Sequence, residues 1–219
     1  MKKGIKTMLR YKRQLIIAAV LLCLIGILSL WKGSLKDDFV PKRFGIVEDG
    51  KIYRSGQLSR WLVERTLRKY NIKVIINLTG DSTKTADKDE EQEAAEKLGI
   101  ERHYFFLGGN GTGDINDYAK AIAIICQAKE KDKPVLVHCA SGTQRAGGVI
   151  AAYRLLIEKK DVPYVVNEMI SYDWSPEKNP YLLPYLNGNM EKLAFLLNQM
   201  GVIDKIPNPL PQIVITDRK

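Results

Sequence analysis

Residues 138–147 read His-Cys-Ala-Ser-Gly-Thr-Gln-Arg-Ala-Gly, and the interpretation of the whole chain starts from this stretch. An apolar run, residues 134–137, precedes it, and an apolar periodic stretch, residues 149–156, follows it. This order predicts a strand, a short loop and a helix. The loop begins with Cys139 and ends with Arg145.

The five residues between this cysteine and this arginine are small or polar, so their backbone N–H groups can turn inward around an anion. Such a loop at a helix N-terminus is suited to bind phosphate. The helix dipole and the arginine both favour the ionised thiolate form of the cysteine. A thiolate aimed at a bound phosphate is a nucleophile for phosphoryl transfer. The candidate substrate-binding residues are Ala140, Ser141, Gly142, Thr143, Gln144 and Arg145.

The pattern of His-Cys, five residues and Arg resembles the signature of the cysteine-based protein tyrosine and dual-specificity phosphatases. Two further segments are similar to the bacterial and plant–fungal atypical dual-specificity branch, namely Tyr53-Arg54-Ser55-Gly56-Gln57 and Ile76-Asn77-Leu78. The likeness extends over residues 44–197. It implies an α/β fold with a single central, mostly parallel sheet flanked by helices.

The resemblance also implies roles for individual residues. Cys139 attacks phosphorus, and Arg145 holds two phosphate oxygens with its planar guanidinium. Gly142 allows a tight turn or a positive φ, and His138 fixes the loop rather than transferring a proton. The sequence departs from most relatives at Ala146, where they carry Ser or Thr, and this departure predicts slower breakdown of the phosphocysteine intermediate.

The general acid is less clearly marked. The resemblance implies an aspartate on a mobile loop, which here corresponds to residues 108–117. Asp114 is the first candidate, because it follows a glycine-rich stretch and lies closest to the family's spacing, although it is also a suitable N-cap for the following helix. The alternatives are Asp117 in the same loop and, on other loops, Asp81 and Asp173.

Strands that alternate with helices predict an α/β architecture with helices on both faces of the sheet. A helix capped by Ser59 is expected over residues 59–70. The predicted organisation is a basic cytoplasmic segment over residues 1–14, a transmembrane signal anchor over 15–31, a tether over 32–43, a phosphatase domain over 44–200 and a Pro-containing tail over 201–219.

The N-terminal prediction depends on charge and hydropathy. Residues 15–31 form an apolar run bracketed by Tyr11 and Trp31, at the lower length limit for a membrane-spanning helix. The first fourteen residues contain basic and no acidic side chains, so the positive-inside rule predicts a cytoplasmic N-terminus and an extracytoplasmic catalytic domain. A cleaved signal peptide is the alternative, but the end of the run is a poor cleavage site.

Composition excludes several classes of function. The net charge is +9, but most of it lies in the first fourteen residues, so nucleic-acid binding is not expected. No group of His, Cys, Asp and Glu has the spacing of a metal site, and the expected mechanism needs neither metal nor cofactor. Three cysteines do not form a disulfide framework. The expected partners are the membrane and a phosphorylated substrate, whether phosphoprotein, phospholipid, glycan or inositol phosphate.

Two other functions remain open at this point. The first is a catalytically impaired pseudophosphatase that only binds phosphoanions, which the residue at position 146 and the unclear acid both suggest. The second is a sulfur-transfer domain, which would explain a loop cysteine but not its five-residue spacing to the arginine.

Overall fold

The computed structural model describes residues 2–30, 36–81 and 84–215, with the side chains of the first helix described over residues 12–26. The chain divides into two compact units, Met1–Val40 and Pro41–Lys219. The first contains α1 (Lys2–Leu30) and α2 (Lys36–Phe39), and the second contains all the strands.

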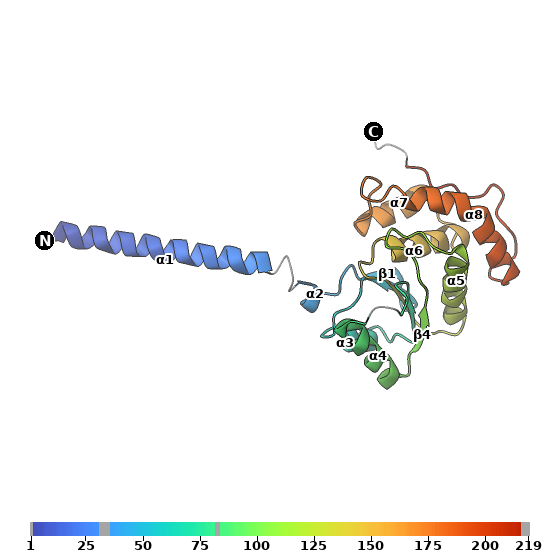
Figure 1. Ribbon diagram of the computed structural model, residues 1–219, viewed down its shortest axis with the longest axis horizontal. Helices are drawn as coiled ribbons and strands as arrows, with labels where there is room; N and C mark the ends of the chain where they lie inside the picture. The colour runs from blue at the N-terminus through green and yellow to red at the C-terminus, as the bar shows by residue number, and fades with distance from the viewer. Residues whose placement is uncertain (1, 31–35, 82–83, 216–219) are drawn as a thin grey trace. The chain divides into compact units, whose positions relative to one another are not determined.

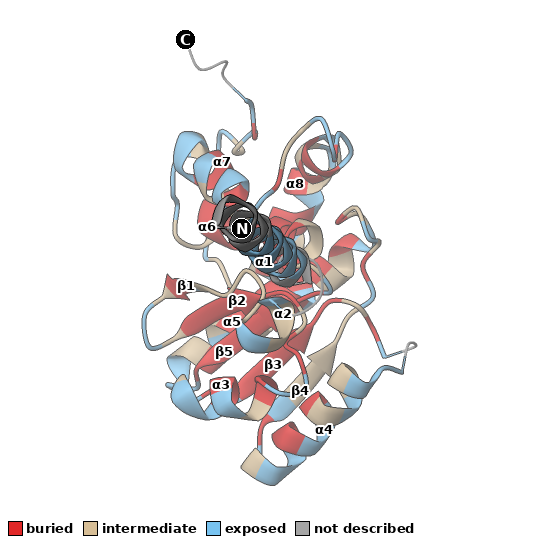
Figure 2. Cartoon of the chain, turned by 90° about the vertical axis from the view of Figure 1, so that its left-hand side faces the viewer, coloured by how far each residue is buried: buried red, intermediate tan, exposed pale blue. Residues whose placement is uncertain are grey.

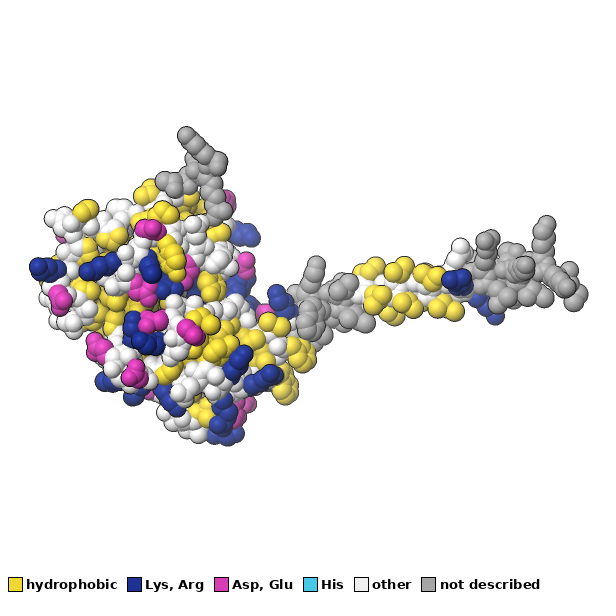
Figure 3. All heavy atoms as spheres, turned by 180° about the vertical axis from the view of Figure 1, so that it is seen from behind, with side chains coloured by type: hydrophobic (Ala, Val, Ile, Leu, Met, Phe, Trp, Pro, Cys, Tyr) yellow, Lys and Arg dark blue, Asp and Glu magenta, His cyan; other side chains and the backbone are white. Residues whose placement is uncertain are grey.

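Helix α1 presents apolar side chains to solvent along its described length (Figure 3), among them Ile16 at 64% and Leu22 at 70% exposure. Within the fully described part of the chain, no helix is long and apolar enough to cross a membrane. Trp31 and residues 32–35 of the predicted tether lie outside the described residues, as do the side chains of Tyr11 and residues 27–30. The predicted transmembrane segment therefore stays a prediction.

The second unit is built on a five-stranded sheet in the order β1-β2-β5-β3-β4. Only the β1–β2 pair is antiparallel, so the sheet is mixed but mostly parallel. His138, the last residue of β5, is aligned with Ser55 on one side and Asn77 on the other. The loop that begins at Cys139 therefore leaves the carboxyl edge of the sheet at its centre. The strands are β1 (Gly45–Glu48), β2 (Ile52–Ser55), β3 (Val74–Asn77), β4 (Glu101–Tyr104) and β5 (Val135–His138).

Alternation along the strands creates two apolar cores. In β5, Val135 and Val137 face one core, and Leu136 faces the other. The larger core is covered by α5, α6, α7 and α8, and the smaller one by α3 and α4 (Figure 1). Figure 2 shows the three central strands, β2, β5 and β3, buried between these layers, whereas β4 at one edge is only partly buried. The helices are α3 (Val63–Lys69), α4 (Ala86–Leu98), α5 (Ile115–Glu130), α6 (Gln144–Leu156), α7 (Val162–Ser171) and α8 (Leu182–Gln199).

The expected boundary at Ser59 is wrong. Helix α3 begins at Val63, and the carbonyl of Ser59 accepts hydrogen bonds from the N–H groups of Leu62 and Val63. Residues 59–62 thus form a turn that leads into the helix, closed by these two backbone hydrogen bonds, and the N-cap residue is Leu62.

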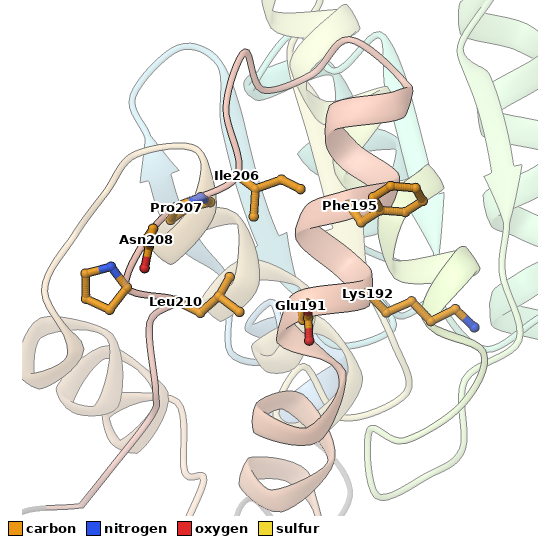
Figure 4. A pocket seen from close by; sticks show the side chains of 8 residues that line it. Glu191, Lys192, Phe195, Ile206, Pro207, Asn208 and Leu210 are labelled. Atoms are coloured by element: carbon orange, nitrogen blue, oxygen red, sulfur yellow. The ribbon is translucent and has the colours of Figure 1, made fainter.

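The described part of the Pro-containing tail, up to residue 215, packs on the domain through Ile213. Ile213 is 2% exposed, and both its backbone N–H and its carbonyl bond to the side chain of Asn187 on α8. Between the tail and α8 lies an open groove of about 730 Å³, lined by residues that include Phe195 and Ile206 (Figure 4). None of its lining residues belongs to the 138–147 stretch.

Candidate active site

The loop between β5 and α6 turns its backbone toward the sulfur of Cys139. The N–H of Gly142 donates to Cys139 Sγ at 3.2 Å, and Cys139 is 1% exposed. Cys139 also belongs to the larger apolar core, together with Ala146. An N–H aimed at the sulfur stabilises a negative charge there. The sulfur is thus buried beside a backbone donor, not enclosed by hydrocarbon alone.

Both the backbone conformation and the space around position 142 require a glycine there. Its φ is +79°, and a Cβ at this position would lie 2.5 Å from the backbone nitrogen of Gly56 and 2.8 Å from the carbonyl carbon of Ser55. Any side chain would force the loop away from the 55–56 backbone. The glycine therefore lets the loop fold closely against the end of β2.

The start of α6 presents donors on the same side of the sheet. Thr143 is the N-cap residue and makes no side-chain capping bond within the described chain. Arg145 is partly buried, and its Nε is buried with no hydrogen-bond partner among the described residues. A buried donor without a partner is costly, so a guanidinium in this state is well suited to bind an anion.

Arg54 on β2 and Gln57 just after it both donate hydrogen bonds to the loop. Arg54 is 1% exposed and donates from Nη2 to the carbonyl of Gly142 at 2.8 Å, while its guanidinium lies 3.9 Å from the ring centre of Tyr172. The backbone N–H of Gln57 donates to the carbonyl of Ala140 at 3.3 Å. Burial lowers the pKa of Arg54, and nearby Tyr172 opposes this. This segment therefore holds the shape of the loop.

A second arginine, which the sequence analysis did not single out, holds the loop from another direction. Arg43 Nη1 donates to the carbonyl of Ser141 at 2.9 Å, and Arg43 Nε donates to Asp173 Oδ2 at 2.7 Å. Both residues have positive φ, +44° and +64°, which is a strained conformation for a side-chain-bearing residue. Asp173 is thus engaged in an ion pair that is linked to the loop.

His138 is almost fully buried beneath the loop, and its ring contacts a carboxylate. Its Nε2 lies 3.2 Å from Oε2 of Glu91 on α4, and the two side chains are 1% and 2% exposed. The sequence analysis missed Glu91, because it stands in an acidic run that is typical of a solvated helix face.

The mobility expected of the glycine-rich loop before α5 stays a prediction, and the structure shows hydrogen bonds that reach this loop from other elements. Tyr118 donates to the carbonyl of Gly111, and Tyr185 donates to that of Gly113. Asn179 donates to the carbonyl of Asn110 at 2.7 Å. Three carbonyl groups of the loop are thus bonded to side chains from α5, from α8 and from the segment before α8.

Asp114 is the N-cap residue of α5. Its Oδ1 accepts hydrogen bonds from the backbone N–H of Asn116 at 2.9 Å and from the side chain of Asn116 at 2.7 Å. These bonds lower the pKa of the exposed Asp114 carboxyl. Asp117 forms an ion pair with Lys120 at 3.7 Å, and Asp81 is exposed. The capping role of Asp114 is observed, and the role of general acid stays a prediction.

Comparison with protein families identifies the segment that contains this site. Residues 56–176 match the family model described as dual specificity phosphatase, catalytic domain. The match covers more than half of the 219 residues and includes Cys139 and Arg145.

Curated proteins give the same result. The chain is 31% identical over 103 residues to the probable dual specificity protein phosphatase H1 homolog of fowlpox virus, which is 47% of this chain and 56% of the relative. It is 33% identical over 75 residues to dual specificity protein phosphatase OPG106 of vaccinia virus strain Western Reserve. The aligned stretch covers 32% of this chain and 44% of that relative. The chain thus spans about half the length of the curated relatives it matches.

Solved structures show a similar fold. Pseudomonas aeruginosa TpbA matches with a TM-score of 0.57 and 19% identity, covering 73% of this chain and 91% of that chain. The core catalytic domain of the PP-IP phosphatase SIW14 from Saccharomyces cerevisiae matches with a TM-score of 0.56 and 20% identity, covering 72% and 94%. At these identities the likeness concerns the α/β fold with its central sheet flanked by helices.

Proposed function

Because the chain belongs to the dual specificity phosphatase family, we propose that it hydrolyses phosphomonoesters through a phosphocysteine intermediate. The observation that supports this most directly is the backbone donor at the sulfur, Gly142 N–H to Cys139 Sγ at 3.2 Å. It lies in a loop that ends at Arg145, whose Nε is buried and has no partner among the described residues.

In the first step the thiolate of Cys139 attacks phosphorus. The S–P bond forms, the P–O bond to the leaving group breaks, and a general acid protonates the departing oxygen. Arg145 and the loop amides stabilise the charge on the equatorial oxygens. In the second step water attacks phosphorus, the deprotonated general acid takes a proton from this water, the S–P bond breaks, and phosphate leaves while the thiolate and the acid are restored.

Ala146 bears on the second step. Most relatives carry a hydroxyl residue there, and Ala146 is fully buried within the core cluster that contains Cys139. An alanine cannot donate a hydrogen bond to the departing thiolate, so breakdown of the intermediate is expected to be slow. This residue is the observation that favours the second candidate function, a phosphoanion-binding pseudophosphatase.

The two functions are separated by phosphate release from the purified full-length chain. A phosphatase releases phosphate from para-nitrophenyl phosphate and leaves a phosphocysteine at Cys139 that acid quenching and mass spectrometry detect. A pseudophosphatase binds vanadate without turnover. The viral relatives are named as protein phosphatases, so phosphotyrosine and phosphoserine peptides are the first natural substrates to test.

We expect Asp114→Asn to separate the two roles of this residue. Asparagine is as good an N-cap as aspartate, so the thermal midpoint should stay unchanged. If Asp114 is the acid, kcat for phenyl phosphate should fall roughly hundredfold or more, because its leaving group needs protonation. The loss should be much smaller for para-nitrophenyl phosphate, whose leaving group is more stable as an anion.

The pKa of Asp114 gives this prediction a pH dependence. Hydrogen bonds from Asn116 lower the pKa, so the protonated acid becomes populated only at a pH below the usual range of aspartate. The acid-dependent rate with phenyl phosphate should therefore rise as pH falls from neutral. Asp117→Asn is the matched control. A loss in Asp117→Asn with full activity in Asp114→Asn would move the assignment to Asp117.

We also propose that residues 15–31 anchor the chain in a membrane, with the N-terminus in the cytoplasm and the catalytic domain outside it. The support is the apolar run itself and the exposure of its side chains on α1, among them Leu15 at 53% and Ile25 at 59%. The basic residues before the run support the orientation.

Extraction and topology test the anchor. The full-length chain should stay in the membrane fraction after an alkaline carbonate wash, and a C-terminal reporter that is active only outside the cytoplasm should be active. Release into the wash would contradict anchoring, and an inactive reporter on a membrane-bound chain would contradict the orientation.

A further inference from the structure

Glu91 is a buried carboxylate on a helix whose neighbouring acidic side chains reach solvent. It is 2% exposed, whereas Asp89 and Glu93 on the same helix are exposed. Glutamate is almost never fully buried in proteins unless its charge is paired. The contacts of Glu91 on the inner face of α4 should therefore show what compensates for its burial.

Two side chains approach the same oxygen of Glu91. His138 Nε2 lies 3.2 Å from Glu91 Oε2, and Gln57 Nε2 donates to it at 2.9 Å. Burial by itself raises the pKa of Glu91, but the contacts with His138 and Gln57, with a smaller contribution from the charge of Arg102, outweigh it and hold the pKa below its ordinary value. These contacts thus favour the ionised form of the Glu91 carboxylate inside the protein.

Both partners of Glu91 also hold the nucleophile loop. His138 is bonded directly to Cys139 in the chain, and its carbonyl accepts the N–H of Leu78. The backbone N–H of Gln57 donates to the carbonyl of Ala140. Glu91 is therefore connected to both chain neighbours of Cys139. It contacts the side chain of His138 directly, and it is linked to Ala140 through Gln57.

We propose that Glu91 is a positioning residue that fixes His138 and Gln57, and through them the place of the Cys139 sulfur in the loop. This inference rests on the proposed function, in which that sulfur is the nucleophile. Glu91 acts through its two neighbours and not on the substrate. Its negative charge, and not only its volume, is needed for this role, because the Nε2 atoms of His138 and Gln57 both approach the same carboxylate oxygen.

The test is Glu91→Gln in the full-length chain, which keeps the volume and removes the charge. Two rates are measured: kcat with para-nitrophenyl phosphate, and the rate at which iodoacetamide alkylates Cys139. Both are expected to fall about tenfold or more, as for loss of one hydrogen bond to a charged group, with KM unchanged. A merely structural role would lower the thermal midpoint and leave both rates of the folded protein unchanged.

Glu93→Gln is the matched control, because it removes the same charge from the exposed face of the same helix. Its kcat and alkylation rate should equal those of the wild type. Should Glu91→Gln fail to fold, Gln57→Ala leaves the Glu91–His138 pair in place and removes the other arm. Slower alkylation in this variant supports the inference, and wild-type alkylation overturns it.

A double substitution tests whether Glu91 works through His138. In a His138→Asn background, Glu91→Gln should add little further loss, because the pair is already broken. An equal loss in both backgrounds overturns the inference, as do wild-type rates in Glu91→Gln alone. Absence of phosphate release by the wild type would reject the proposed function, and the alkylation rates would still decide the role of Glu91.

Discussion

Replacing Cys139 with serine is expected to abolish phosphate release, with a loss of roughly four orders of magnitude or more, as for other catalytic nucleophiles. A serine hydroxyl stays protonated at neutral pH and is a far weaker nucleophile toward phosphorus than a thiolate. Serine has nearly the same shape, so the buried site should keep its fold. Initial rates with para-nitrophenyl phosphate measure the effect.

Cys126 provides a control within the same chain. It lies partly buried on α5, where burial, with a smaller effect of Glu130, raises its pKa to about 11. It is therefore a neutral thiol at pH 7, and Cys126→Ser should retain wild-type turnover. Cys139→Ser should still bind vanadate, which shows an intact loop. Full activity in Cys139→Ser would reject the proposed nucleophile.

Arg145→Lys is expected to cause the second-largest loss, roughly a hundredfold to a thousandfold in kcat/KM, similar to removal of one transition-state donor. Lysine keeps the positive charge but cannot present two parallel N–H groups to two phosphate oxygens. Its ammonium would also not replace the buried Nε donor of Arg145. Both a lower kcat and weaker vanadate binding should follow.

Arg65→Lys is the matched control, because Arg65 is an exposed arginine on α3. It should leave kcat/KM unchanged. If Arg145→Lys also kept wild-type kcat/KM, the bidentate role of Arg145 would be wrong, and charge alone would explain its contribution.

The local features of this site could be predicted from the sequence, because they depend on neighbouring residues. The apolar residues before Cys139 and the periodic ones after Arg145 predict the strand, loop and helix that are observed. Glycine at position 142 predicts a backbone with positive φ, and its φ is +79°. The alternation of strands and helices predicts an α/β fold, although the antiparallel β1 makes the sheet mixed.

The boundaries of elements and the contacts of loops were less predictable. The helix expected from Ser59 begins instead at Val63, since a turn competes locally with the first helical residues. The carbonyls of the glycine-rich loop before Asp114 accept hydrogen bonds from Tyr118 and Tyr185. Nothing in the sequence around these two tyrosines indicates which carbonyl each side chain reaches.

By itself, then, the amino-acid sequence determined the loop from Cys139 to Arg145 and the α/β alternation, which arise from short-range patterns of polarity and backbone freedom. Only the tertiary structure decided which distant side chains support that loop: Arg43 on Ser141, Arg54 on Gly142, and Glu91 beneath His138. An acidic run such as residues 89–93 predicts an exposed helix face. Packing of α4 against the sheet buries one of its carboxylates, and a buried charge must find a partner inside the protein.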